Sequence, residues 1–158
     1  MKKVVMLLMA SAVFGLSGCV VQPVSNLPKP GVVVDANNHM AVAPVVKAAK
    51  ALLDKQYAPA STKFHLAQPQ DAFGVALVEE LRQMGYGILE TPLVPPKDKE
   101  GKPIDIEIPE DSKHLFYVWD VFGKDLYRLM LKVDEQRYAV VFAKDGEIYR
   151  LVSPWTLM

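Results

Sequence analysis

The last third of the chain consists of short apolar runs separated by turn residues, and this pattern restricts the fold more than any other feature. The runs cover residues 115–122, 126–133, 138–143 and 147–152. Asp145 and Gly146 stand between the last two runs, and an Asp-Gly pair in that setting is a strong signal for a two-residue hairpin turn. Residues 123–125 and 134–136 make the other connections equally short. Strands joined by such short turns pair with their sequence neighbours in antiparallel order, so the pattern predicts a meander.

Two helices and two further strands are predicted ahead of the meander. Apolar residues recur at spacings of three and four over residues 42–55 and 71–84, which is the period of an amphipathic helix. Asp71 suits the N-cap of the second helix. A run typical of a strand follows each helix, at residues 62–68 and 86–90. This order predicts an α+β fold, in which a small antiparallel or mixed sheet carries two helices packed on one face.

The N-terminus has the layout of a secretory signal. Lys2 and Lys3 precede an almost uninterrupted apolar run from Val4 to Leu16. A charged start, an apolar stretch of about 7–15 residues and small residues before a cut are the parts of an export signal. The run is too short to span a membrane, which takes about 20 residues. We therefore expect residues 1–18 to be a signal peptide that is removed on export.

The residues at the predicted cleavage site resemble the lipobox of bacterial lipoprotein precursors. Leu16 is followed by Ser17 and Gly18, two small residues, and then by Cys19, the only cysteine in the chain. Precursors of that class are cleaved before the cysteine, which then carries acyl chains. The resemblance therefore implies lipid attachment at Cys19 and contact with the membrane through its acyl chains. The alternative is an ordinary signal peptide with a chance cysteine.

Residues 19–40 are predicted to be a flexible tether, and residues 41–158 a folded periplasmic α+β domain. Three prolines and Gly31 in the first part of the tether argue against a helix or a central strand. Residues 32–34 are three valines, which leaves a short strand docked on the domain as an alternative. Val20 directly follows Cys19, where lipoproteins held at the inner membrane often carry Asp. By this resemblance we expect the protein at the outer membrane, with its domain facing the periplasm.

The segment from residue 92 to residue 112 is rich in proline and charge, unlike the runs around it. Ile104, Ile106 and Ile108 alternate with Asp105 and Glu107, so part of the segment is predicted to pair as an edge strand. Loops of this length inside a compact domain are usually functional or mobile. One hypothesis is that the segment becomes ordered by packing or strand addition against another component. The other is that its isoleucines fold onto their own sheet.

The sequence contains no constellation typical of catalysis or metal binding. His39, His65 and His114 lie far from one another, and there is no second cysteine, so metal-ligand spacing is absent. His65 falls on the polar side of its strand, where a solvated side chain is expected. Glu79 and Glu80 are neighbours on a helix and point about 100° apart, which is typical of a solvated face rather than an acid/base pair. We expect no enzyme, no cofactor and no metal.

The charge balance gives no basis for direct nucleic acid binding. Lys plus Arg and Asp plus Glu number 18 each. Proteins that bind nucleic acid through its phosphates present a basic patch or stripe, and a balanced chain of this kind does not predict one.

Large aromatic side chains are expected on both faces of one strand. They are Phe116, Tyr117, Trp119 and Phe122. Either this is a central strand covered on both sides, or one of its faces meets a partner, since exposed aromatic patches mark interfaces.

Several stretches together resemble the TrbH family of conjugal transfer lipoproteins, which is found with plasmid type IV secretion genes. The lipobox and the chain length fit this family. So do residues 57–62, which lead into a strand, and the helix that contains Phe73, Gly74, Leu77, Leu81 and Arg82 and is closed by Gly85 and Tyr86. The resemblance covers nearly the whole chain, and apart from the lipobox it consists of packing and turn residues. It implies an outer-membrane lipoprotein of the mating-pair apparatus, with other apparatus proteins as partners, and only the acylated cysteine carries over, onto Cys19.

Two functions remain open at this point. The first is an assembly or structural component of a conjugative type IV secretion apparatus. The second is a periplasmic lipoprotein that binds a small ligand or a cell-wall fragment. A deep pocket lined by Phe116 or Trp119 would favour ligand binding. A flat apolar patch or a free strand edge would favour assembly.

The first prediction concerns the anchor. Cys19→Ser removes the thiol that would carry lipid, so we expect an unprocessed precursor without acyl label. One acyl chain binds a membrane reversibly and two or more anchor it stably, so the variant should also be lost from the membrane fraction. The measurement is incorporation of labelled palmitate, followed by fractionation. Normal incorporation in the variant would sink the lipoprotein interpretation.

Overall fold

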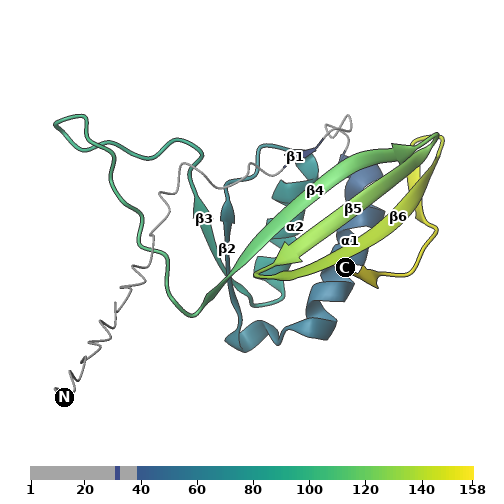
Figure 1. The fold of residues 1–158 in the computed structure, drawn as a ribbon, viewed down its shortest axis with the longest axis horizontal. Helices are drawn as coiled ribbons and strands as arrows, with labels where there is room; N and C mark the ends of the chain where they lie inside the picture. The colour runs from purple at the N-terminus through teal and green to yellow at the C-terminus, as the bar shows by residue number, and fades with distance from the viewer. Residues whose placement is uncertain (1–30, 33–38) are drawn as a thin grey trace, which may run out of the picture.

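The computed structural model describes residues 31–32 and 39–158 (Figure 1). In chain order the elements are β1 (Gly31–Val32), α1 (His39–Gln56), the 3₁₀ helix η2 (Pro59–Ser61), β2 (Lys63–Ala67), α2 (Ala72–Gln83), β3 (Gly87–Thr91), β4 (Ser112–Gly123), β5 (Leu126–Val133), β6 (Gln136–Asp145), β7 (Ile148–Leu151) and β8 (Thr156–Leu157). The predicted α+β fold is confirmed, as a mixed sheet with two helices.

The sheet follows the order β3-β2-β4-β5-β6-β7, with β1 beside β4 and β8 beside β6. The predicted meander is confirmed, because β4, β5, β6 and β7 pair antiparallel in succession. β3, β2 and β4 pair in parallel, and β2 meets β4 only over residues 112–114. Further along the same edge of β4, β1 pairs in parallel with Val118 and Trp119.

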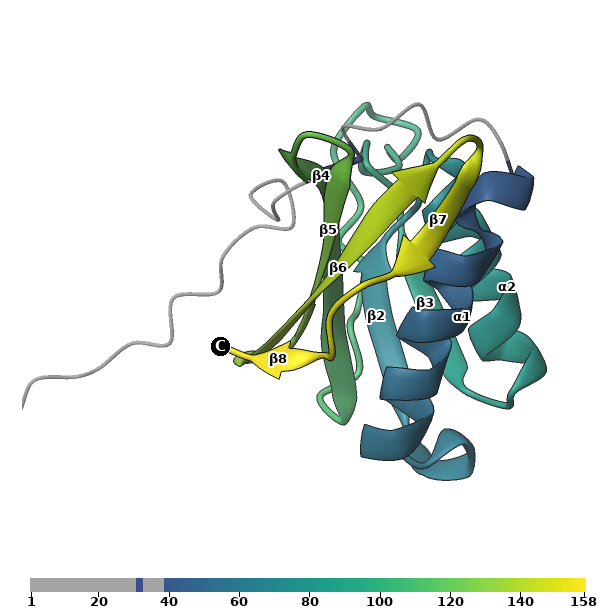
Figure 2. The same ribbon diagram turned by 90° about the vertical axis from the view of Figure 1, so that its right-hand side faces the viewer.

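Both helices lie on one side of the sheet, as predicted (Figure 2). α1 packs against α2 and β7, and α2 also contacts β3. Alternate residues of the strands point toward the helices and are buried, as expected for a sheet with one covered face. The largest fully buried side chains are Trp119, Tyr117, Phe64, Phe73 and Phe142. Burying each contributes about 1.5–3 kcal/mol or more to the free energy of unfolding.

The start of α2 is fixed to β4 by a polar contact inside this core. Asp71 is the N-cap, as predicted, and one carboxylate oxygen accepts the backbone N–H of Gly74 at 2.8 Å. The other oxygen accepts the Tyr117 hydroxyl at 2.6 Å. Burial, together with the Asp71 carboxylate, raises the pKa of Tyr117 far above its usual value. A Cβ on Gly74 would lie 1.9 Å from the Tyr117 hydroxyl oxygen, so only glycine allows this close approach.

Parts of the predicted tether belong to the fold. β1 confirms the strand alternative for Val32, and α1 begins at His39, three residues earlier than predicted. Val33 and Val34, the predicted signal peptide and Cys19 lie outside the described residues. No helix among the residues that the structure describes is long and apolar enough to span a membrane.

The predicted edge strand at residues 104–108 is wrong. These residues belong to no strand, and the one β-bridge of the segment joins Lys97 to Pro103. Alternation of apolar and polar residues sets which way side chains would point in a strand, but a strand forms only beside a partner. Pro103 and Pro109 also remove a backbone donor at each end of the segment.

A second prediction follows from the packing of α2 on β4. Gly74→Ala would gain about 1 kcal/mol in an exposed helix interior, but here we expect a loss of about 1–3 kcal/mol in the free energy of unfolding, because the new methyl overlaps Tyr117. Tyr117→Phe should relieve part of this loss when the two changes are combined. Chemical denaturation of the single and double variants measures the coupling. Val75→Ala, on an exposed site of the same helix, is the control, and a Gly74→Ala variant as stable as wild type would refute the contact.

Candidate interaction site

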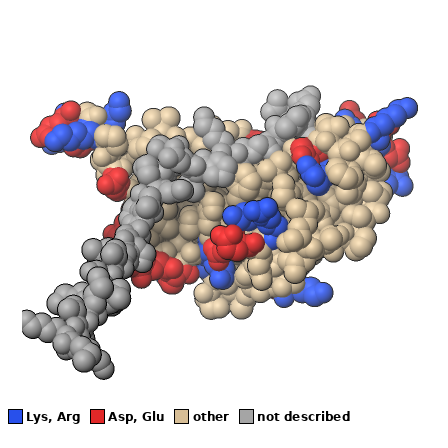
Figure 3. All heavy atoms as spheres, in the orientation of Figure 1, with Lys and Arg blue, Asp and Glu red and all other residues tan. Residues whose placement is uncertain are grey.

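Residues 92–111 form an arm that projects away from the sheet between β3 and β4 (Figure 1). Its tip is held by Asp98, whose carboxylate accepts the backbone N–H groups of Glu100 and Lys102 at 2.9 and 2.8 Å. The backbone N–H of Asp98 donates to the carbonyl of Lys102, and that of Ile104 donates to Pro96. Charged side chains gather at the tip, as Figure 3 shows. The tip is therefore a structured turn.

Apolar side chains lie exposed along the stem of the arm. Val94 is 74% exposed and Ile104 is 45% exposed, and Leu93 is exposed as well. Ile106 and Ile108 are half-buried, and none of the three isoleucines belongs to the buried core. The hypothesis that the isoleucines fold onto their own sheet is therefore wrong for Ile104. Sequence analysis missed Leu93 and Val94, although an apolar pair between prolines was a usable signal.

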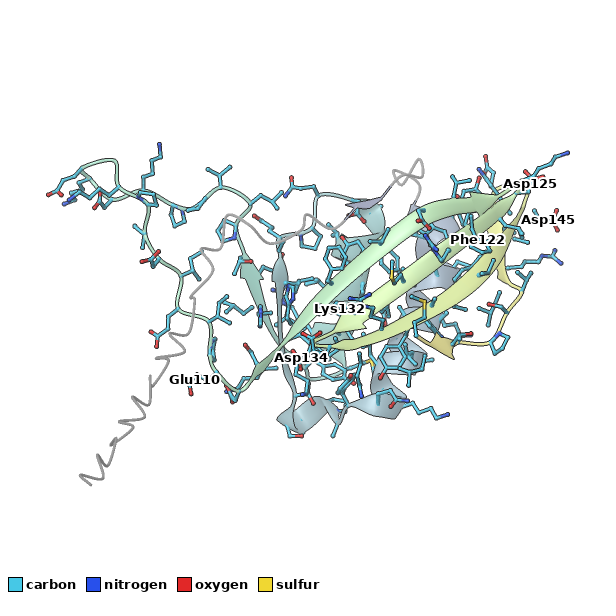
Figure 4. All side chains as sticks on the ribbon, in the orientation of Figure 1. Glu110, Phe122, Asp125, Lys132, Asp134 and Asp145 are labelled. Carbon is cyan, nitrogen blue, oxygen red and sulfur yellow. The ribbon has the colours of Figure 1, made fainter. Side chains whose placement is uncertain are left out.

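The side of the sheet opposite the helices, here called the open face, is a second surface. Tyr117 and Trp119 point to the helices and are fully buried, whereas Phe116 lies half-buried on the open face. Phe122 is 55% exposed, and the Arg128 guanidinium lies 5.3 Å from the centroid of its ring. Figure 4 shows Phe122 and Lys132 on this face. The interpretation of β4 as a strand covered on both sides is therefore wrong within the described residues.

Charged groups of the open face are satisfied by one another. Arg128 donates two hydrogen bonds to Asp120, at 2.6 and 3.1 Å, and these bonds raise the pKa of Arg128. Lys113 lies 3.4 Å from Asp134, at the turn after β5. Figure 3 shows charged side chains near the middle of a mostly uncharged surface. The face is thus nearly neutral.

Two histidines predicted to be isolated are brought together at the edge of the open face. His65 and His114 are register partners on β2 and β4, and their rings stack with centroids 4.9 Å apart. Burial lowers the pKa of both side chains. The neighbouring His114 lowers the pKa of His65 further, and Lys132 does the same for His114. The Asp134 carboxylate raises the pKa of both histidines, but this only partly offsets the lowering. His65 is half-buried against His114, a partner that the sequence analysis did not identify because it is set by strand register.

The hydrogen bonds at the histidine pair run in the wrong direction for an activated serine nucleophile. Ser112 donates its hydroxyl proton to the carbonyl of Pro109 at 2.6 Å. His65 Nδ1, 3.0 Å from the same hydroxyl oxygen, must then be the donor of the second bond. An activated serine needs the reverse direction, with histidine as the acceptor. The described residues also include no group of three or more His, Cys, Asp and Glu side chains that could hold a metal ion.

A groove of about 660 Å³ runs between α1 and α2. Its lining is mixed and includes Val46, Lys50 and Asp54 from α1, Glu80 from α2, and Met84 at the C-cap of α2. Lys50 and Glu80 form an ion pair across it. A deep pocket lined by Phe116 or Trp119 would have favoured ligand binding, but neither residue lines this groove.

The far end of the sheet presents a third apolar surface. β7 is the last strand of the order, and no described strand lies beyond it. Ile148, Leu151 and Val152 are each 54% exposed there. Leu157 on β8 and Met158 directly after it are exposed nearby in sequence. Exposed aliphatic side chains at a strand edge are typical of an interaction site.

Comparison with known proteins identifies a family match. A protein-family model described as conjugal transfer protein TrbH matches residues 29–158. No curated protein and no solved structure matches the chain.

A third prediction concerns the histidine pair. A histidine with a lowered pKa in the folded state becomes protonated at a lower pH than in the unfolded chain. Acid therefore favours the unfolded state. The free energy of unfolding should therefore be highest above about pH 6.5 and should fall as the pH drops through the lower folded-state pKa values. His65→Gln combined with His114→Gln should flatten this fall between about pH 7 and pH 5. His39→Gln, which leaves the pair intact, is the control, and equal slopes for all three chains would contradict the prediction.

Proposed function

Because the chain belongs to the TrbH family of conjugal transfer proteins, we propose that it is an outer-membrane lipoprotein acting as an assembly component of a conjugative type IV secretion apparatus. The family match covers the folded domain and supports the role in conjugation. The proposal goes beyond the family match in three points: attachment through a lipid, localisation at the outer membrane and a structural role.

The arm is the observation that carries the structural role. Val94 and Ile104 are exposed on a segment that projects from the domain, and the tip beyond them is held by its own hydrogen bonds. An apolar side chain of this size gains about 1.5–3 kcal/mol when it is removed from water. Burying these exposed side chains against another protein would release that free energy. A projecting segment of this kind therefore supports a role in protein contact more than a role in catalysis.

The lipid anchor rests on Cys19 and its place relative to the domain. Residues 20–30 separate Cys19 from Gly31, where the described fold begins. Fully extended, this length reaches roughly 40 Å. An acylated Cys19 would hold the β1 side of the domain within that distance of the outer membrane, facing the periplasm.

The role is proposed to be non-catalytic. The Ser112 hydroxyl donates to a backbone carbonyl, and the nearest histidine donates to that hydroxyl instead of accepting from it. This arrangement supports a fixed polar contact at the start of β4.

A fourth prediction tests the arm in cells. Val94→Asp and Ile104→Asp place a charge where a partner would need an apolar side chain, so each should lower conjugal transfer from donor cells by about tenfold or more. Both sites are exposed, so abundance and membrane fractionation should stay normal. Val75→Asp, at an exposed site on α2, is the matched control and should transfer normally. Unchanged transfer in both arm variants would overturn the proposed role.

A further inference from the structure

A possible donor and a possible acceptor of β-strand pairing lie at opposite ends of this molecule. β3 and β7 are the two ends of the six-strand order, and the arm begins directly after β3. Figure 4 shows Glu110, near the end of the arm, and Asp145, next to the hairpin that leads into β7, far apart on opposite sides. Each copy of the chain therefore carries both parts, well separated.

The acceptor is the edge of β7. Natural edge strands are usually protected by lysine, proline or a bulge. β7 has none of these, and Arg150 is its only charged residue. Alternation places Ile148 and Arg150 on the open face and Leu151 on the helix side, so both faces of the edge offer an exposed aliphatic side chain. Arg150 pairs with Asp145 at 3.1 Å, but both side chains are more than half exposed and free to exchange partners.

The donor is the stretch of the arm at residues 104–108. It is not part of any strand, yet Ile104, Ile106 and Ile108 alternate with Asp105 and Glu107. Neither carboxylate forms an ion pair with a described residue, and the stretch contains no cation. Its acidic charge is complementary to Arg150. Its apolar face suits a strand edge bordered by aliphatic side chains.

We infer that residues 104–108 of one copy add as a strand to β7 of a second copy. This inference rests on the proposed function, since it names the partner of the arm. Strand addition supplies backbone hydrogen bonds for affinity and alternate side chains for specificity. It would complete the pairing that the sequence pattern of residues 104–108 predicts and that the isolated chain does not form.

The arm cannot reach the β7 edge of its own copy. Register places Leu151 in one row with Phe142, Tyr127 and Val121. Val121 lies nine residues along β4 from Ser112, or roughly 30 Å, and β7 lies three strands to the side, or roughly 14 Å. Ile104 is eight residues before Ser112 and extends at most about 28 Å from it. The occupant must therefore be another molecule.

The resulting contact is head-to-tail. The donor surface of one copy meets a different surface on the next, so every bound copy still offers a free arm or a free edge. Such heterologous contacts generate rings when the rotation closes and filaments when it does not.

Site-specific photocrosslinking in intact donor cells tests the inference on the full chain. A benzophenone side chain at Ile106 should give an adduct of twice the chain mass, and its crosslinked peptide should contain residues 148–152. The same probe at Val75 is the matched control and should give no such adduct. Arg150→Glu should lower the yield about tenfold, and adding Asp105→Lys with Glu107→Lys should restore it by reversing the charges.

The outcomes separate this inference from the function on which it rests. An adduct between the arm and a protein of different mass would overturn second-copy pairing and leave the assembly role standing. An adduct within one chain, or with another surface of a second copy, would overturn the inference alone, as would absence of any adduct while Val94→Asp still impairs transfer. No adduct together with normal transfer in the arm variants would overturn both.

Discussion

The whole sheet depends on how the backbone of β4 is shared among its neighbours. One edge of this strand pairs with β5 from Leu115 to Gly123. The other edge is divided, first to β2 over three residues and then to β1 over two. β4 therefore joins a parallel part to an antiparallel meander. Its side chains point to both sides of the sheet. Tyr117 donates a hydrogen bond to Asp71 at the start of α2, whereas Phe116 and Phe122 lie on the open face.

Trp119 illustrates the balance of forces within this strand. Its indole N–H is buried and has no hydrogen-bond partner among the described residues. The ring meets Phe142 and Tyr149 edge-on at 5.3 and 5.1 Å and stacks on Tyr127 at 5.9 Å. Contacts of this kind contribute about 0.5–1.5 kcal/mol each beyond burial. Aromatic packing therefore holds this side chain in place.

Local patterns in the sequence predicted what depends on near neighbours. The hairpin before β7, the N-cap at Asp71 and the alternation of the last third all involve residues a few positions apart, and all are found. The two turn residues of that hairpin are Gly146 and Glu147 instead of the expected Asp145 and Gly146, because Asp145 pairs with Ile148 as the last residue of β6. Features that depend on register between distant segments could not be predicted from the sequence. His65 meets His114 only because β2 lies parallel to β4, and the alternation at residues 104–108 contains no information about whether a partner strand is present. β8 was missed because two residues carry no measurable period. Among the interaction surfaces, the arm was marked by composition, whereas the β7 edge could be recognised only once the strand order was known.

The two-residue pairing of β1 has a mechanical consequence. Within the described part of the chain, a pull from the N-terminal side acts first on Gly31 and Val32, whose parallel pairing with Val118 and Trp119 is loaded along the strand direction. Because this ladder is so short, it would yield before α1 or the meander. Its release would free the eight residues up to His39 and lengthen the connection by up to about 28 Å without unfolding the core. In a protein tethered through Cys19, β1 would then act as a latch that yields under tension while the sheet stays intact.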